Sequence, residues 1–399
     1  MPQYRALNDT EDNTESTALL TSGQRKHPFF RNPWIIAALS FCTLGFTMGI
    51  IMYSGLILPR NLKSSIKVWQ TSQFHGDRHT LLDAAELMKR GFEVDSMSFS
   101  IKKDCHQLPS TECTDEEVSK MQVDSGKHYQ TVLGFGGAFT EAAANTWSKL
   151  PETVRDKVIQ SYFGVNGIGY TLGRVHINSC DFSIDSYSFD DVSKDYDLKF
   201  FDMQVTHDQA EMIPMMRAAI RVSQNPIRLL ASPWSPPAWL KLPDKDGRHS
   251  MTGSAYPYCL KHTYKARSTW AKYISLFIEA YKAQGIPIWA VTPQNEPEFP
   301  APWEACAYNT SGMDQFLGDH LGPTLDKDHP EVLILGFDHN KDHLVHWTTD
   351  LMAGHSAKYL DGMAFHWYAG SNDRLMDGTF GYDAVNATHH MIPDKLLVG

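Results

Sequence analysis

A glutamate that directly follows a short apolar run is the strongest chemical signal in the sequence. Residues 288–292 are apolar and rich in β-forming side chains, so we expect a buried strand that Pro293 ends. Asn295, Glu296 and Pro297 come just after this strand. Loops after the strands of a (β/α)8 barrel build its active site, and a carboxyl group placed there can transfer protons. Glu296 is therefore our candidate general acid, although a surface turn could contain the same three residues.

Two further apolar runs also end in polar and aromatic side chains. Residues 229–233 lead to Trp234 and a proline-rich turn, and residues 362–365 lead to His366, Trp367 and Tyr368. Aromatic rings pack against the C–H faces of sugars, whereas carboxylates and amides bind the hydroxyl groups. A single Trp would more simply be a core residue. Three strand ends of this kind together predict one carbohydrate pocket.

The composition sets limits on the class of protein. The chain has 399 residues, of which 42% are hydrophobic and 12% aromatic, enough for one large core and a small appendage. A net charge of −10 argues against nucleic acid as a partner. We found no run of residues with metal-ligand spacing and no phosphate-binding loop, so we predict no metal and no cofactor.

The N-terminal part has the organisation of a membrane-anchored protein. Residues 34–58 carry no charge and are long enough to cross a bilayer, so we predict a transmembrane signal anchor in preference to a buried soluble helix. Residues 1–33 are polar and are predicted to form a disordered tail. Tyr4–Leu7 and Glu15–Leu20 in this tail resemble motifs that cytosolic sorting adaptors read.

This arrangement predicts a location for the protein. The tail would be cytosolic and the catalytic region lumenal, in a single-pass type II protein of the lysosome, vacuole or endosomal system. Asn309 and Asn386 begin acceptor sequences for N-glycosylation, which matter only in the lumen.

The six cysteines give one candidate disulfide. Cys42 falls in the predicted membrane span, and Cys105 and Cys113 lie close together in a polar stretch, so we expect these two to form a local disulfide. Cys180, Cys259 and Cys306 remain. Because their number is odd, at least one should stay free.

Two regions lie between the predicted anchor and the polar strand ends. Residues 59–90 are expected to form a stem with one amphipathic helix, and residues 91–100 and 126–132 are expected to form strands.

From residue 129 onward the chain resembles the glucosylceramidases of glycoside hydrolase family 30. The resemblance covers about 270 residues, and its motifs occur in the same order as in the family. These motifs are Gly134–Ala144, Gly167–Tyr170, Ser179–Ser183, Leu230–Trp234, Trp289–Thr292, Asn295–Pro297, Leu321–Leu325 and His366–Tyr368.

The resemblance implies a retaining β-glucosidase that hydrolyses glucosylceramide. It also implies a (β/α)8 TIM barrel, here residues 131–399, fused to a β-sandwich to which the strands in residues 91–130 belong. In this scheme Glu296 is the acid/base, Asn295 binds the sugar 2-hydroxyl, and Arg174 holds carboxylates in register. Trp234, His366, Trp367 and Tyr368 would line the glucose pocket. Glu141 stands where the family has an aspartate that binds outer sugar hydroxyls. Since the loop at residues 298–303 also differs from glucosylceramidase, hydrolysis of β-1,6-glucan, another activity in the family, is the alternative.

The second catalytic carboxylate is expected beyond the present sequence. In the family, the nucleophile follows a strand like Lys395–Gly399, which would place it at about position 401. We therefore expect the chain to be part of a longer protein, with an incomplete barrel that lacks its last β/α unit and shows no hydrolysis by itself. In the complete protein the ionised nucleophile should raise the pKa of Glu296. A lumenal sugar-binding protein without turnover is the hypothesis from a different class.

Overall fold

The computed structural model describes residues 126–244, 246–255, 257–369 and 381–399, and the backbone of five strands before them. The chain divides into two compact units, residues 1–129 and 130–399. The predicted tail, sorting motifs, membrane span and Cys105–Cys113 disulfide lie outside the described residues. Within the described part, no helix is long and apolar enough to cross a membrane.

The described strands of the first unit form two small antiparallel sheets. In one, β1 (Val68–Ser72) pairs with β2 (Asp77–Leu82). The other contains β3 (Phe92–Asp95), β4 (Ser98–Ile101) and β5 (Ser119–Gln122).

Two local predictions for this part of the chain were wrong in detail. The stem contains two strands, β1 and β2, which we did not expect, whereas residues 83–91, where its helix could lie, are outside the described residues. Residues 91–100 do not form a single strand, because they contribute to two antiparallel strands, β3 and β4, in which Phe92 pairs with Ile101. The stretch 126–132 is not a strand. It begins with Gly, Lys and His and lacks the alternation of apolar and polar residues that a half-buried strand needs.

The second unit is built on a curved parallel sheet of seven strands. Its order follows the chain, from β6 at one edge to β12 at the other. The strands are β6 (Gly136–Ala138), β7 (Leu172–Ile177), β8 (Arg228–Pro233), β9 (Ile288–Val291), β10 (Leu333–Asn340), β11 (Gly362–His366) and β12 (Leu396–Val398). This TIM-barrel-like half-barrel confirms the predicted class of the second unit. Among the described strands, β6 and β12 each pair with one neighbour only.

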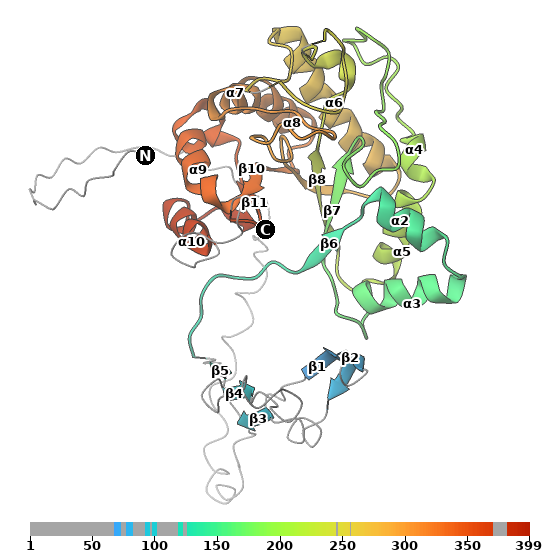
Figure 1. Cartoon of the computed structure of the whole chain (residues 1–399), viewed down its shortest axis with the longest axis vertical. Coiled ribbons are helices and arrows are strands. Elements are labelled where there is room, and N and C mark those ends of the chain that lie inside the picture. Colours follow the sequence, from blue (N-terminus) through green and yellow to red (C-terminus); the bar gives the residue numbers. More distant parts are fainter. Residues whose placement is uncertain are drawn as a thin grey trace, which may run out of the picture. The chain divides into compact units, whose positions relative to one another are not determined.

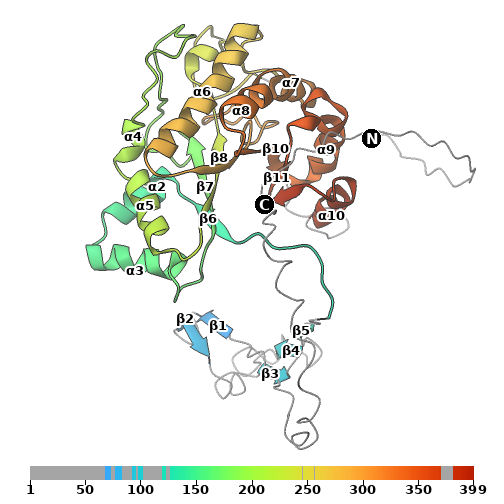
Figure 2. The ribbon, with the colours of Figure 1, turned by 180° about the vertical axis from the view of Figure 1, so that it is seen from behind.

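Helices between the strands lie on the outer side of the sheet, as Figures 1 and 2 show from opposite directions. They are α2 (Glu141–Ser148), α3 (Glu152–Phe163), α4 (Thr206–Gln209), α5 (Met212–Val222), α6 (Tyr264–Ala283), α7 (Thr310–Phe316), α8 (Gly322–Asp328), α9 (Leu344–Ala353) and α10 (Tyr382–Met391).

The longest helix, α6, shows how the sequence directs this packing. The side chain of Thr263 caps its first turn by accepting a hydrogen bond from the N–H of Ala266. Trp270, Phe277 and Tyr281 recur at helical spacing and are completely buried. The concave side of the sheet has a smaller apolar cluster with one residue from each of four neighbouring strands, namely Leu230, Ala290, Leu335 and Ala364. Packing on both faces fixes the strands whose carboxyl ends carry the polar residues.

Candidate active site

Five neighbouring strands, β7 to β11, bring polar side chains to one pocket. Arg174 lies on β7, Trp234 follows β8, Glu296 follows β9, Asp338 lies on β10, and His366 ends β11. All five line a cavity of about 650 Å³. Residues of β6 and β12 line it as well, so all seven strands of the sheet contribute to the cavity.

The backbone of Glu296 is held in an uncommon conformation. Its φ is 46°, in the left-handed region that non-glycine residues rarely adopt. The N–H of Glu296 donates to the carbonyl of Asp338 at 3.0 Å, and its Oε1 lies 3.0 Å from Nδ1 of His366. Non-glycine residues in such conformations cluster at active sites, where surrounding contacts hold them in place.

Asp338 is the anchor of the site. It sits in a β-bulge of β10, where Phe337 and Asp338 both have positive φ and the register with β11 shifts. Its buried carboxylate lies 2.8 Å from Arg174 Nη2, 2.6 Å from the Thr292 hydroxyl and 3.1 Å from His366 Nε2. Burial alone would raise the pKa of Asp338, but the charge of Arg174 and the hydrogen bond of His366 hold it well below its usual range.

His366 bridges two carboxylates. Its ring lies between Glu296 and Asp338. Nδ1 is 3.0 Å from Glu296 Oε1, and Nε2 is 3.1 Å from Asp338 Oδ1. Burial would lower the pKa of His366, but the hydrogen bonds with Asp338 and Glu296 raise it overall. The bridge therefore favours an imidazolium between two carboxylates.

The pKa of Glu296 responds to this neighbour. Burial would raise it, but the hydrogen bond and charge of His366 outweigh burial and lower the pKa. This differs from our expectation of a raised pKa, which rested on a nucleophile carboxylate that we place beyond the present sequence. Among the described residues, the effect of the histidine prevails.

Arg174 contacts three other residues of the site. One nitrogen, Nη2, donates to Asn295 Oδ1 and to Asp338 Oδ2, both at 2.8 Å, and the guanidinium lies 4.6 Å from the centre of the Trp234 ring. The residue thus lies against a carboxylate, the amide next to Glu296 and an aromatic wall. The structure brings Arg174, Asn295 and Trp234 together, as the sequence suggested, and adds Asp338, which the sequence analysis did not name.

The aromatic wall is only partly enclosed. Trp234 is buried, whereas Trp367 and Tyr368 are 62% and 38% exposed, with ring centres 4.5 Å apart. All three line the pocket. Exposed rings at a pocket mouth can stack on a sugar or on an apolar aglycone.

The comparison with known proteins agrees with this geometry. Residues 132–399 match the glycosyl hydrolase family 30 TIM-barrel domain. The chain belongs to glycosyl hydrolase family 30. Putative glucosylceramidase 4 of Caenorhabditis elegans is 36% identical over 287 residues, which cover 70% of this chain and 53% of that protein.

Further relatives give the same picture of the family. Lysosomal acid glucosylceramidase of Mus musculus is 34% identical over 278 residues, which cover 68% of this chain and 51% of that protein. A solved structure of an endo-β1,6-glucanase has a TM-score of 0.59 and 25% identity, covering 69% of this chain and 58% of that one. The chain spans about half the length of the curated relatives it matches.

Two aspartates of this family 30 site escaped the sequence analysis. Asp338 follows an apolar run, the same signal that identified Glu296, but we did not apply it there. Asp181 lines the pocket with Glu296. Burial raises the pKa of Asp181, which also feels the charge of Glu296 and accepts a hydrogen bond from Trp234. Its only sequence signal was the motif Ser179–Ser183.

Glu141 does not lie where we expected it. It is absent from the residues that line the main pocket and instead lines a smaller cavity of about 310 Å³ with His207 and Glu211. Its carboxylate accepts a hydrogen bond from the N–H of Ile184 at 3.2 Å. Its other oxygen lies 3.5 Å from Nε2 of His207. Both oxygens thus face protein groups outside the main pocket, so direct sugar binding by Glu141 does not fit this geometry.

Glu296, His339 and His366 could in principle bind a metal. One donor atom of each lies within 4.8 Å of the others. Both ring nitrogens of His366 already have carboxylate partners, so an ion would have to break the bridge between Glu296 and Asp338. The hydrogen bonds account for this arrangement without a metal.

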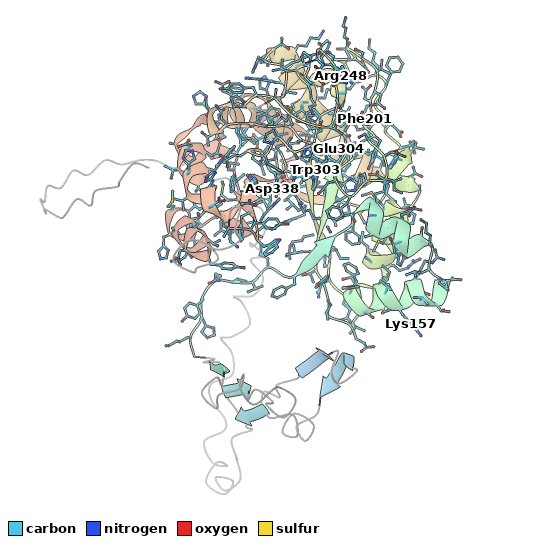
Figure 3. All side chains as sticks on the ribbon, viewed as in Figure 1. Lys157, Phe201, Arg248, Trp303, Glu304 and Asp338 are labelled. Atoms are coloured by element: carbon cyan, nitrogen blue, oxygen red, sulfur yellow. A yellow bond between two sulfur atoms is a disulfide. The ribbon has the colours of Figure 1, made fainter. Side chains whose placement is uncertain are left out.

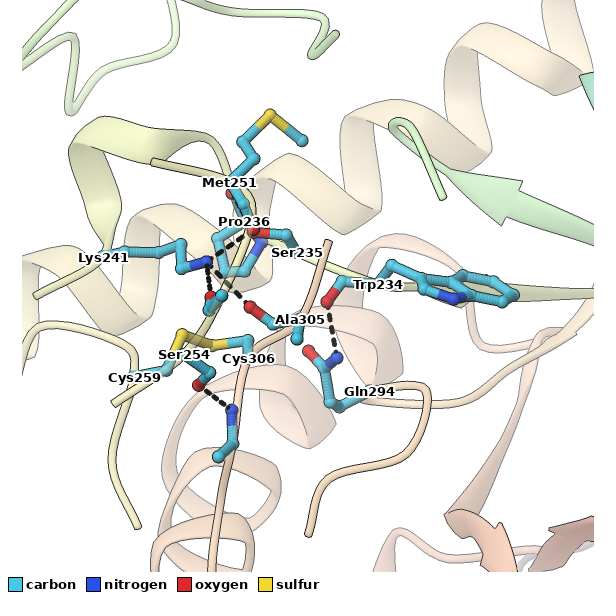
Figure 4. Close-up of a disulfide and its surroundings, with 12 residues drawn as sticks. Trp234, Ser235, Pro236, Lys241, Met251, Ser254, Cys259, Gln294, Ala305 and Cys306 are labelled. Atoms are coloured by element: carbon cyan, nitrogen blue, oxygen red, sulfur yellow. Dashed lines mark hydrogen bonds between the residues drawn. A yellow bond between two sulfur atoms is a disulfide. The ribbon is translucent and has the colours of Figure 1, made fainter. Parts of the chain in front are cut away.

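A disulfide that we did not predict fixes the loops beside the pocket. Cys259 bonds to Cys306, as Figure 4 shows. Cys180 is free and buried. Beside the disulfide, the buried Lys241 donates to the carbonyls of Met251, Gly253 and Ala305, each at 2.7 Å. Burial lowers the pKa of Lys241 to about 7. The loops 241–261 and 301–308 are therefore held to each other.

The two predicted glycosylation sites have different surroundings. Asn309 caps α7 by accepting from the N–H of Gly312, and its Nδ2 donates to the Tyr258 hydroxyl at 3.0 Å. Asn386 is exposed on α10. A glycan at Asn309 would have to replace the hydrogen bond to Tyr258, whereas Asn386 is freely accessible.

Proposed function

We propose that the complete protein is a retaining β-glucosidase with Glu296 as its acid/base. The observation that carries this proposal is the position of Glu296, at a strand end in the pocket and hydrogen-bonded to His366. Membership of family 30 supports it. Asp338 orients His366, and His366 in turn fixes the carboxyl group of Glu296 in the pocket.

The proposed reaction has two steps. A second carboxylate, about 5–5.5 Å from Glu296 in a retaining enzyme, attacks the anomeric carbon while Glu296 gives its proton to the leaving oxygen. The glycosidic bond breaks and a covalent glucosyl-enzyme forms. Glu296 then takes a proton from water, which attacks the same carbon and releases glucose and the carboxylate.

For the substrate we propose glucosylceramide. The glucosylceramidase names of the relatives support this choice, and so does the sequence of residues 34–58, because an anchor would keep the enzyme beside its lipid substrate. We further propose a type II membrane protein of the lysosome, vacuole or endosomal system, sorted by adaptors that bind the N-terminal tail. The endo-β1,6-glucanase neighbour favours β-1,6-glucan as the second candidate.

The acid/base assignment can be tested with Glu296→Gln in the full-length protein. The substitution keeps the shape but removes the proton, so the hydrolysis of glucosylceramide should fall by about 10²–10⁴-fold. Glu298→Gln is the matched control, because Glu298 is two residues away and hydrogen-bonds to His343 at 2.7 Å outside the pocket. Near-normal hydrolysis by Glu296→Gln would refute the assignment.

The substrate is tested on the same preparation. Purified full-length protein is given glucosylceramide in detergent with anionic lipid, or a β-1,6-glucan, at matched bond concentrations. We expect hydrolysis of the lipid. Glucan cleavage without lipid cleavage would favour the second candidate, and binding of either substrate without turnover would favour a sugar-binding protein.

A further inference from the structure

The loop that carries Asp181 is closed at its neck. It runs from Ser179 to Tyr187 after β7 and brings Asp181 to the pocket. The N–H of Ser179 donates to the carbonyl of Tyr187 at 3.1 Å, and the N–H of Tyr187 donates to the Ser179 hydroxyl at 3.1 Å. Within the loop, the N–H of Ser183 also donates to the carbonyl of Cys180 at 2.9 Å, and the N–H of Cys180 donates to the Ser183 hydroxyl at 3.0 Å. These bonds shape the loop, and contacts with other elements fix its position against the pocket.

The start of α2 fixes one side of the tip. The carboxylate of Glu141 accepts from the N–H of Ile184 at 3.2 Å, and the N–H of Ala142 donates to the carbonyl of Phe182 at 3.0 Å. Glu141 is only 7% exposed, and its own N–H donates to His176 Nε2 at 3.3 Å. A carboxylate held in this way is a firm acceptor for the loop backbone.

A second buried carboxylate fixes the other side. Glu304, labelled in Figure 3, is 6% exposed and belongs to the loop that follows Glu296. Its Oε1 accepts from the Ser179 hydroxyl at 3.1 Å and also from the Ser186 hydroxyl. The backbone of Glu304 bridges to Thr252, in the region that Lys241 and the disulfide hold together.

We propose that Glu141 and Glu304 are positioning residues that hold Asp181 in the pocket and so set the affinity for the hydroxyl groups of the glucoside. Neither side chain lines the main pocket, whereas Asp181 does. The two carboxylates come from chain segments more than 160 residues apart and both bind the 179–187 loop. This inference rests on the proposed glucoside substrate, and it replaces the direct sugar contact that the sequence suggested for Glu141.

A double-mutant cycle tests whether Glu141 acts through Asp181 or contacts the sugar directly. In the full chain, we would measure the dissociation constant of p-nitrophenyl β-glucoside by tryptophan fluorescence for Glu141→Ala, Asp181→Ala and the double variant. We expect Glu141→Ala alone to weaken binding about tenfold, and to add little once Asp181 is gone, because it acts through Asp181. Independent, additive losses would mean direct contact with the sugar and would overturn the inference.

Hydrogen exchange of the 179–187 segment gives a second readout that needs no ligand. Exchange at the Ile184 amide should become faster in Glu141→Ala but remain close to wild type in Glu141→Gln, whose amide oxygen can still accept the bond. If Glu141→Ala fails to fold, Glu304→Ala takes its place in both measurements. Its exchange is then followed at the Tyr187 amide, which should become faster, because the acceptor of that amide, the Ser179 hydroxyl, is held by Glu304.

Glu211→Ala is the matched control. Glu211 lines the same small cavity as Glu141 but hydrogen-bonds to Asn145 and Ser148, and no contact joins it to the 179–187 loop among the described residues. The Glu211→Ala variant should leave both readouts unchanged. Unchanged exchange in both Glu141→Ala and Glu304→Ala would refute the positioning role. If the wild-type chain binds no glucoside while Glu141→Ala still makes exchange faster, only the proposed substrate is contradicted.

Discussion

The residues of the site form a chain of charges centred on His366. Arg174 fixes Asp338, Asp338 orients His366, and His366 faces Glu296. The sequence could indicate Glu296 because one local pattern marked it. It could not indicate that the pKa of Glu296 is lowered, because that depends on three strands that meet only in the fold.

Replacement of His366 by Ala should raise the pKa of Glu296. The variant removes the hydrogen bond and charge that lower it, and burial, which raises it, then prevails. In a complete enzyme, the alkaline limb of kcat/KM would move to higher pH, since the acid stays protonated longer. NMR titration of labelled glutamate in this chain measures the pKa directly. His343→Ala, which removes the partner of Glu298, is the control, and a lower pKa in His366→Ala would contradict this prediction.

Replacement of Arg174 by Met should lower the free energy of unfolding by about 3–5 kcal/mol at pH 7, because it leaves Asp338 buried without its cation. The pKa of Asp338 is depressed, so its stabilising effect is present above the unfolded pKa and is lost as pH falls through the folded pKa. The deficit of the variant should therefore shrink in acid. Urea unfolding at several pH values tests this. Arg248→Met, from an exposed pair with Asp244, should change little, and an equal deficit at every pH would contradict the argument.

At the scale of elements, apolar runs between breakers located strands of the second unit, whereas pairings between distant residues could not be predicted from the sequence. The expected strand at 288–292 is β9 at Ile288–Val291, and the run at 395–399 contains β12. Apolar runs between breakers are local signals, so they survive without knowledge of the fold. Cys259 and Cys306 are 47 residues apart, and only the packing of two loops brings them together. The position of Glu141 likewise followed from tertiary packing and not from its motif.

The Cys259–Cys306 disulfide should stabilise the second unit by about 4 kcal/mol, the chain-entropy value for a loop of 47 residues. The variant Cys259→Ser/Cys306→Ser should unfold at lower urea concentration than the wild type. Added reductant should lower the midpoint of the wild type and leave that of the variant unchanged. Cys180→Ala, at the free buried cysteine, should retain the response to reductant. A variant as stable as the wild type would show that the bridge contributes nothing.

At the scale of the whole chain, the sheet determines what chemistry is available. It runs in one order from β6 to β12, and residues of these two strands and of the five between them line the pocket. Within the part of the chain that the structure describes, β6 and β12 each pair with one strand only. Unpaired strand edges favour self-association, and closed barrels avoid it. The chain also covers about half the length of its curated relatives. We therefore attribute the proposed activity to the complete protein.

The chain of 399 residues by itself should release no p-nitrophenol from p-nitrophenyl β-glucoside, in a burst or at steady state. A retaining enzyme needs a free, ionised carboxylate about 5–5.5 Å from its acid. Asp338 is bound by Arg174, Thr292 and His366, and the pKa of Asp181 is raised, so neither is a ready nucleophile. A burst that Asp181→Asn abolishes would identify Asp181 as the nucleophile. It would refute the prediction that the nucleophile lies near position 401. A burst that survives Asp181→Asn but not Asp338→Asn would assign the same role to Asp338.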